Sequence, residues 1–334
     1  MLPTNPERPA GVTLADTLNH ALKEILAADR TVLLMGEDVG RLGGVFRITK
    51  GLQEQFGADR VFDTPLSEGG VVGLAIGQAL AGMRPIVEIQ FDGFVLPALN
   101  QIIGHMAKMP TRLNHDTPLP VIVRLPFGGR IKATEFHSES PEALFVHSPE
   151  LTVVAASRPE TAGALLRSVV AAGNPTIFME PKREYYRNRV DPALLVASLD
   201  HRRCEVVRTG TDVTLFTYGP TVSLGIEAAA HVLKQGINCA VVDLVSLAPL
   251  DVEGICSLAR QTKRVIAISE AVERCSVASE VVSLIARNAF DSLEVAPSVV
   301  ASPNRPPPPP AFEADYFPSV GRVCEAILRQ CSDR

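Results

Sequence analysis

The sequence predicts an α/β protein of two domains, each built around a mostly parallel sheet. Short β-branched runs alternate with helical stretches through both halves of the chain, which is the order of βαβ units. The expected strands are apolar along almost their whole length, as in sheets that helices cover on both faces. With 334 residues, the chain also exceeds what one hydrophobic core comfortably supports.

In the first half, apolar residues at helical spacing predict a helix over 13–28 with Thr13 as its N-cap. The pattern also predicts helices over about 94–109 and 159–172. Ser67 is expected to cap a glycine-rich helix that runs toward Gly82. Short buried runs predict strands, in chain order, at 32–35, 61–62, 86–89, 121–123, 151–155 and 176–179.

Between about residues 183 and 203 the pattern weakens into a charged segment, which is a candidate linker. A second α/β series follows, with strands expected at 213–217, 240–244, 265–268 and 295–301, and helices at 222–234, 251–260, 277–287 and 320–330. Five prolines at 306–310 favour a stiff surface connector over an SH3-type ligand. The expected domains are therefore 1–185 and 204–334, joined by a linker at 186–203.

Composition and motifs exclude several classes of function. The net charge of −5, without a basic run, argues against a nucleic-acid partner. The six cysteines form no C-x-x-C pair, which is typical of a reducing compartment and of neither a disulfide framework nor a zinc site. No dinucleotide or P-loop fingerprint, G-x-S-x-G elbow or H-E-x-x-H motif occurs.

The hydropathy pattern predicts a cytoplasmic protein with no membrane partner. The longest apolar stretch, at 71–83, is shorter than the roughly 20 residues that a membrane span needs. Residues 1–9 lack the apolar core of a signal peptide.

Three candidate functional groups lie where open α/β sheets bind their ligands, at the carboxyl ends of strands. Glu37 and Asp38 follow the first expected strand, Glu68 lies at a strand-to-helix turn, and His137 lies on a loop after a later strand. Each has a structural alternative: turn capping for the Glu37–Asp38 pair, a helix-dipole contact for Glu68, and a surface role for His137. The local pattern leaves these alternatives open.

A stripe of small residues runs along the glycine-rich helix. Gly69, Gly73, Gly77 and Ala81 fall every fourth residue and so share one helix face. Such a stripe lets another helix or a ligand approach closely. The spacing does not separate packing within the domain from a subunit interface.

Six ordered blocks of the sequence resemble the beta chain of the thiamine-diphosphate-dependent first component of 2-oxoacid dehydrogenase complexes, over essentially the whole length. These blocks are 34–39, 43–47, 60–68, 85–91, 137–145 and 174–182. The resemblance implies a pyrimidine-binding, transketolase-like domain with a mostly parallel sheet, followed by a smaller α/β domain of the transketolase C-terminal type. The segments at 43–47 and 88–91 are more similar to branched-chain 2-oxoacid members than to pyruvate members.

The resemblance implies a role for each candidate residue. Glu68 matches the carboxylate that hydrogen-bonds the aminopyrimidine of thiamine diphosphate and favours its imino tautomer. Glu37 and Leu66 match residues that line the same pocket, and Phe94 matches an aromatic residue that stacks on the pyrimidine, where many relatives carry tyrosine. His137 matches the active-site histidine, which would bind the substrate carboxylate or intermediate as a cation and assist reductive acylation of the lipoyl group.

The resemblance also implies metals and partner chains. In some relatives a potassium ion is held by backbone carbonyls that match those of Leu119, Val121, Ile122, Ala172 and Asn174. Enzymes of this class hold magnesium and diphosphate with a Gly-Asp-Gly motif, and this sequence contains none. We therefore expect an alpha subunit that holds magnesium and the diphosphate, in an alpha2-beta2 heterotetramer, and a lipoyl acyltransferase core.

The expected function is oxidative decarboxylation of a 2-oxoacid with acyl transfer to the lipoyl group. Branched-chain oxoacids are the expected substrates, with pyruvate and acetoin as alternatives. A transketolase-like transferase and a non-enzymatic assembly subunit are alternative functions of other classes. The loop before His137 departs from the family pattern, because Arg130 and Lys132 make it more charged and poorer in glycine. That departure predicts altered substrate choice or loop order. The segment 272–278 also lacks the usual glycine pair, which puts the local interface geometry in doubt.

Overall fold

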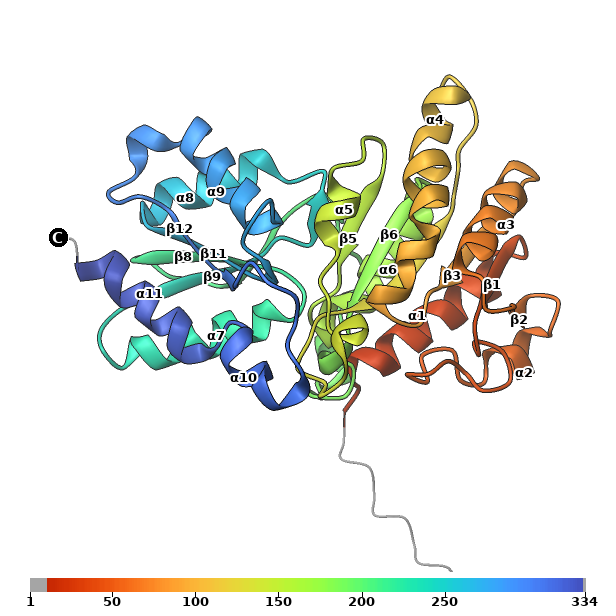
Figure 1. The fold of residues 1–334 in the computed structure, drawn as a ribbon, viewed down its shortest axis with the longest axis horizontal. Helices are drawn as coiled ribbons and strands as arrows, with labels where there is room; N and C mark the ends of the chain where they lie inside the picture. The colour runs from red at the N-terminus through yellow and green to blue at the C-terminus, as the bar shows by residue number, and fades with distance from the viewer. Residues whose placement is uncertain (1–10, 333–334) are drawn as a thin grey trace, which may run out of the picture.

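Two sheets with helices on their faces organise the computed structural model, which describes residues 11–332 (Figure 1). The expected absence of a signal peptide falls on residues 1–9, outside the described part of the chain. The two-domain α/β class and the mostly parallel sheets are confirmed. Within 11–332, no helix has the length and apolar character that crossing a membrane requires.

The first sheet has seven strands in the order β10-β5-β6-β4-β3-β1-β2. All neighbours pair in parallel except β10 and β5. The strand bounds are β1 Val32–Gly36, β2 Val61–Asp63, β3 Arg84–Glu88, β4 Ile122–Phe127, β5 Thr152–Ala155, β6 Thr176–Pro181 and β10 Ser246–Ala248. The edge strand β10 lies after residue 203 in the chain, so the second half of the sequence completes the first sheet.

Helices α1 (Leu14–Ala28) and α6 (Pro159–Ala172) pack together on one face of this sheet. Thr13 caps α1 as predicted, and its side chain and Asp16 form a reciprocal capping box. Helix α3 (Glu68–Leu80) covers the other face. Ser67 precedes α3, but the prediction of a side-chain cap is wrong: the exposed Ser67 hydroxyl makes no cap hydrogen bond, and its ψ of 80° departs from the extended N-cap conformation.

The segment expected as one helix over 94–109 is helical, but the prediction of a regular α-helix is wrong. It consists of η1 (Asp92–Ala98), a π-helical turn η2 (Asn100–His105), η3 (Met106–Lys108) and α4 (Met109–Arg112). Pro97 lies inside η1 and has no N–H to donate, which interrupts the α-helical ladder.

The second sheet has five strands in the order β12-β11-β8-β9-β7, with only β7 antiparallel. Its bounds are β7 Glu205–Arg208, β8 Val213–Thr217, β9 Cys239–Asp243, β11 Val265–Val272 and β12 Ser298–Ser302. The helices are α7 Thr221–Leu233, α8 Val252–Thr262, α9 Val277–Asn288 and α11 Val320–Ser332, with short α2 Leu52–Phe56, α5 Glu142–Val146 and α10 Glu313–Tyr316 elsewhere. The two strands that the sequence did not predict, β7 and β10, are short and lie at sheet edges.

One apolar core runs from the first sheet into the second. It contains residues of α3, β3 and β4 as well as Phe216, Val242 and residues of α8 and α9. A separate cluster lies under α1 and α6, and a third under α7 and α11. The two units therefore share buried surface, and loops at the junction are held from both sides.

Candidate functional site

A recess opens at the carboxyl edge of β1, β2 and β3. These ends meet because Gly36 pairs with both Asp63 and Glu88 in the parallel register. Glu37 follows β1, residues 64–68 form the turn from β2 into α3, and Glu88 ends β3. The recess is lined by these residues together with Val71, Ile89 and Gln90. The structure thus brings together Glu37, Leu66 and Glu68, which the sequence places 31 positions apart at most.

The recess is electrostatically acidic. Burial raises the pKa of Glu37 above its ordinary value, and the charges of Asp38 and Glu68 raise it further. The Gln90 amide donates to Asp38 Oδ2 at 3.2 Å, which ties the turn after β1 to β3. A carboxyl group of raised pKa beside a second carboxylate is suited to hydrogen-bonding a nitrogen base.

Two further groups in the recess bear on what it could bind. Leu66 is 76% exposed, so an apolar side chain stands beside the carboxylates. Thr64 Oγ1 is buried and has no hydrogen-bond partner among the described residues. An unpaired buried hydroxyl is costly, and a polar ligand group would satisfy it. The donors and apolar contacts present here therefore fit a small heteroaromatic ring such as an aminopyrimidine.

The structure also places His137 against Phe94. The His137 ring lies 4.3 Å from the Phe91 centroid and 5.2 Å from that of Phe94, edge-on to both. The close approach depends on Gly93, where a Cβ would lie 2.5 Å from the Phe136 carbonyl oxygen. His137 ends the short 3-10 helix η4 (Glu135–His137), so its ring is held by packing and by its backbone.

His137 lies in surroundings that disfavour its charged form. Burial lowers its pKa, and the Lys182 ammonium lowers it further, against an opposing effect of Glu135. Thr134 Oγ1 lies 3.1 Å from Nδ1. These surroundings favour the neutral imidazole, which can both donate and accept a hydrogen bond.

Sequence reasoning missed the ion pair beside His137. Lys182 Nζ lies 2.5 Å from Asp92 Oδ1, and both side chains are fully buried. Burial raises the pKa of Asp92 to about 7 and lowers that of Lys182. Lys182 also stands 5.7 Å from the Phe91 ring centroid. The strand-end rule could have found it, because Lys182 directly follows β6 at the same edge of the sheet.

A buried network supports the recess from below. Arg124 donates to Glu88 Oε2 at 2.5 Å and to both carboxylate oxygens of Glu180 at 2.7 and 2.9 Å. The Tyr185 hydroxyl donates to Glu180 at 2.6 Å. Glu88 and Arg124 sit opposite each other in the β3–β4 register. The network ties three strands together and holds Glu88 rigidly at the floor of the recess.

The segments that contain the carbonyls expected for potassium lie at the opposite edge of the sheet, where β4 and β6 begin. Ile122 pairs with Thr176, which brings the two segments side by side. The carbonyls of Leu119, Val121 and Asn174 each accept one hydrogen bond, at 2.8, 2.9 and 2.9 Å, and each keeps a second lone pair. Ala172 ends α6, where carbonyls lack intrahelical donors. Among residues 11–332, no group of three or more His, Cys, Asp or Glu side chains is placed to hold a metal.

The glycine stripe of α3 divides between two environments. A Cβ at Gly69 would lie 3.1 Å from the Pro97 carbonyl oxygen, and one at Gly73 would lie 3.6 Å from the Gln101 side chain. These two glycines therefore pack inside the domain, against η1 and η2. A Cβ at the exposed Gly77 would meet no atom within 4 Å of it.

Comparisons with known proteins agree with this architecture. Residues 10–188 match the model of the transketolase pyrimidine binding domain, and residues 202–323 match that of the transketolase C-terminal domain. A solved structure titled split gene transketolase, inactive beta4 tetramer, superposes with a TM-score of 0.77 at 20% identity, covering 96% of this chain and 99% of that one. The similarity to this structure concerns the fold.

Curated relatives are similar over almost their whole length. The chain is 42% identical to the pyruvate dehydrogenase E1 component subunit beta of Leifsonia xyli, over 96% of this chain and 95% of the relative. It is 39% identical to the 2-oxoisovalerate dehydrogenase subunit beta of Bacillus subtilis, over 95% and 98%. It is 40% identical to the 3-methyl-2-oxobutanoate dehydrogenase subunit beta of Mycobacterium tuberculosis, over 95% and 91%. The chain therefore belongs to the family of beta chains of the thiamine-diphosphate-dependent first component (E1) of 2-oxoacid dehydrogenase complexes.

Proposed function

We propose that this chain is the beta subunit of a branched-chain 2-oxoacid dehydrogenase first component. It would take part in oxidative decarboxylation of the oxoacid and in acyl transfer to the lipoyl group of an acyltransferase. One observation carries the proposal. The Glu37–Glu68 recess and the Phe94–His137 pair lie at the same edge of the first sheet. Relatives named for branched-chain 2-oxoacids support the substrate, together with the segments at 43–47 and 88–91.

Glu68 and Glu37 would hold the aminopyrimidine end of thiamine diphosphate. When bound, the cofactor supplies the nucleophilic carbon and the electron sink for decarboxylation. Glu68 would exchange a proton with a ring nitrogen, and Glu37, whose pKa burial raises, would stand beside it as a second hydrogen-bonding carboxyl group. Leu66 and Phe94 would provide apolar contact with the ring.

His137 would act on the substrate side of the site. Its neutral imidazole can donate an N–H to the substrate carboxylate or oxygen, and can take up a proton as charge develops during acyl transfer. Packing against Phe91 and Phe94 fixes the ring plane, so the proton is delivered in one direction.

The other half of the site would come from an alpha subunit. The sequence contains no Gly-Asp-Gly motif, so we propose that the alpha chain holds magnesium and the diphosphate in an alpha2-beta2 heterotetramer. Potassium would bind the carbonyls at the starts of β4 and β6. The complete complex would include a lipoyl acyltransferase core.

Pyruvate is the second candidate substrate, because the relative at 42% identity is named for it. The decisive experiment co-expresses the chain with candidate alpha chains and assays decarboxylation with thiamine diphosphate and magnesium. We expect a higher kcat/KM for 3-methyl-2-oxobutanoate than for pyruvate, and no turnover by this chain alone. Turnover by the isolated chain would contradict the shared site, and a preference for pyruvate would overturn the branched-chain assignment.

A further inference from the structure

The loop that carries His137 crosses from the first unit to the second before it reaches the site. Its backbone is anchored there at two points: the Gly129 N–H donates to Glu270 Oε2 at 3.2 Å, and the Lys132 N–H donates to Glu313 Oε2 at 3.2 Å. Glu270 lies in β11 and Glu313 begins α10, so both acceptors belong to the second unit. The contact is close, because a Cβ at Gly129 would lie 2.0 Å from Phe317 Cζ.

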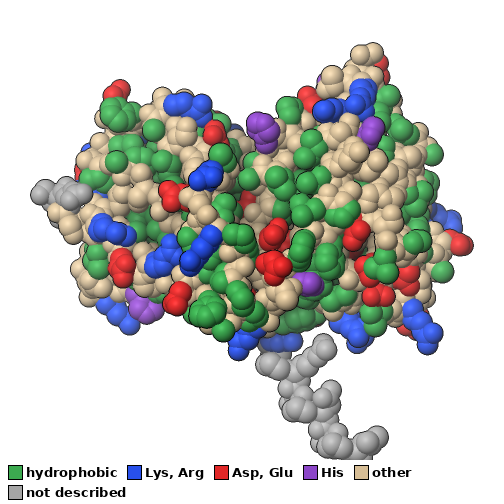
Figure 2. Space-filling view, viewed as in Figure 1, with side chains coloured by type: hydrophobic (Ala, Val, Ile, Leu, Met, Phe, Trp, Pro, Cys, Tyr) green, Lys and Arg blue, Asp and Glu red, His purple; other side chains and the backbone are tan. Residues whose placement is uncertain are grey.

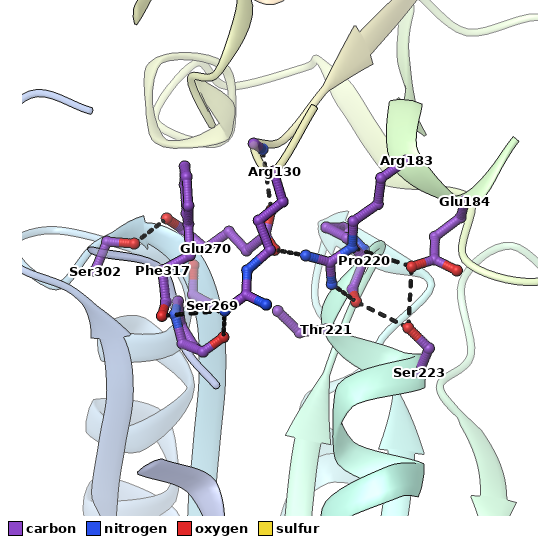
Figure 3. Close-up of polar contacts among 12 residues, drawn as sticks. Arg130, Arg183, Glu184, Pro220, Thr221, Ser223, Ser269, Glu270, Ser302 and Phe317 are labelled. Carbon is purple, nitrogen blue, oxygen red and sulfur yellow. Dashed lines mark hydrogen bonds and ion pairs between the residues drawn. The ribbon is translucent and has the colours of Figure 1, made fainter. Parts of the chain in front are cut away.

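Arg130 adds a side-chain anchor at the same place. Its Nη2 donates to the carbonyl oxygens of Phe317 and Pro318, at 3.3 and 2.6 Å (Figure 3). Its backbone has a φ of 63°, in the left-handed region that glycine adopts without strain and arginine does not. The strained backbone is compensated by two charge-assisted hydrogen bonds that no glycine could make.

A second arginine holds the acceptor of the first anchor in place. Arg183 Nη1 lies 2.5 Å from Glu270 Oε1, which leaves Oε2 free for Gly129, and Arg183 Nη2 donates to the Pro220 carbonyl at 2.7 Å. Figure 3 shows both arginines directed toward the second unit, Arg130 toward Phe317 and Arg183 toward Glu270 and Pro220. Arg183 directly follows Lys182, the cation beside His137. The two sides of the His137 environment are thus tied to one carboxylate.

We propose that Arg130 is a positioning residue: its bonds to Phe317 and Pro318 hold the loop 128–137 on the second unit and thereby fix His137 against Phe91 and Phe94. The inference rests on the proposed function for the catalytic consequence, while the anchoring itself is measurable without activity. The loop runs only seven residues from Arg130 to His137, and η4 forms its last three residues. A displacement at Arg130 therefore reaches the imidazole.

The test uses the assembled complex and two matched glycine variants. Arg130→Gly removes the guanidinium bonds and relieves the left-handed strain. Lys132→Gly relieves the same kind of strain, at a φ of 57°, and keeps the backbone N–H that Glu313 accepts. Lys132 has an exposed side chain, so this variant is the control for loop flexibility alone. Arg130→Lys keeps one charged donor, so its amide exchange and kcat should lie between those of Arg130→Gly and those of the wild type.

We expect Arg130→Gly to raise amide hydrogen exchange at residues 129–138 about tenfold or more, and to lower kcat for lipoyl acylation about tenfold with little change in KM. We also expect the His137 imidazole, followed by NMR, to titrate closer to its ordinary pKa, because it moves away from Lys182 and into water while Glu135 stays on the same loop. Lys132→Gly should match the wild type in all three measurements.

Equal exchange in the two glycine variants would overturn the anchor, and faster exchange with an unchanged kcat and His137 titration would overturn the positioning role. Failure of the proposed function looks different: the wild-type complex would then turn over no 2-oxoacid, while exchange and the His137 titration would still report on the anchor. A thermal midpoint equal to that of Lys132→Gly shows that Arg130→Gly is folded.

Discussion

At the scale of single residues, Glu68 owes its position to a turn rather than to a helix cap. The Ser67 hydroxyl is exposed and makes no cap hydrogen bond with the N-terminus of α3. Glu68 is the first residue of α3, and it lines the recess together with Glu37. A carboxylate at a helix N-terminus is common for dipole reasons alone. The paired carboxyl groups and the unsatisfied Thr64 hydroxyl are what point to a ligand.

The first prediction separates those two readings of Glu68. Glu68→Gln in the assembled complex should lower decarboxylation by roughly 100- to 10,000-fold, the usual effect of losing a positioned acid–base group. Glu54→Gln is the matched control, because Glu54 is an exposed acid in the first turn of α2. Steady-state kinetics measure the effect, and a Glu68 variant as active as the Glu54 control would leave only the dipole role.

The second prediction concerns the pH dependence of His137. Because burial and Lys182 lower its pKa, the imidazole stays neutral to a pH below its ordinary value of 6.5. If the neutral form acts, kcat/KM should fall only below that value as the pH decreases, and the acidic limb should be absent from His137→Asn. A limb that persists unchanged in the variant would assign it to another group.

At the scale of elements, α3 shows how one pattern serves two purposes. Gly69 and Gly73 admit the irregular helical segment η1–η2, whose Pro97 carbonyl approaches the helix closely. Gly77 continues the stripe onto open surface. The first part of the stripe is accordingly internal packing, and only the end at Gly77 is free for a partner chain within the described structure.

The third prediction follows from this division. Gly77→Ala should stabilise the isolated chain by up to about 1 kcal/mol, since alanine is the better helix former and no atom opposes its methyl group. Gly69→Ala should destabilise it by about 1 kcal/mol or more, because the methyl group meets a backbone carbonyl that has little room to move. Urea denaturation measures both changes. The same sign for both variants would contradict the division of the stripe into a packed part at Gly69 and an open end at Gly77.

At the scale of the whole molecule, the two units are joined by a shared core and by buried polar contacts. The Tyr218 hydroxyl of the second unit lies 2.5 Å from Glu142 Oε1 and 2.6 Å from Ser269 Oγ. The Ser157 hydroxyl donates to the buried Asp243 carboxylate across the same junction. The view in Figure 2 shows acidic and basic side chains interspersed over both lobes, without an extended basic patch.

The fourth prediction uses the Glu142 carboxyl, whose pKa burial raises from 4.5 to about 7. Between these two values the folded chain keeps a proton that the unfolded chain has lost, so this contribution to stability falls as the pH rises and is fully lost above about 7. Glu142→Gln is neutral at every pH and keeps an acceptor for Tyr218. Its stability relative to the wild type should therefore rise with pH, by at most about 3 kcal/mol at pH 8. Thermal unfolding at pH 5 and pH 8 measures the change, and a difference that is independent of pH would contradict the buried-carboxyl account.

Much of the fold was predictable because local pattern and tertiary environment agree. Helix α6 occupies the predicted residues 159–172, and Thr13 caps α1, since helical spacing and capping depend on neighbours within one or two turns. The recess was also predictable in part, because the carboxyl ends of parallel strands must meet at one edge. Irregularity at Pro97 and the pairing of short edge strands were not, because they depend on packing.

The sequence by itself determined the class of fold, the two α/β series and the family, and it singled out Glu37, Glu68, Phe94 and His137. Only the tertiary structure decided what surrounds them. The Lys182–Asp92 pair joins residues 90 positions apart, and the anchors of the His137 loop join residues 141 and 187 apart. Local periodicity reports burial and hydrogen bonding along the chain, whereas these contacts arise when distant strand ends and loops are brought to one edge by the sheet register. That is why the residues could be predicted and their pKa values and anchors could not.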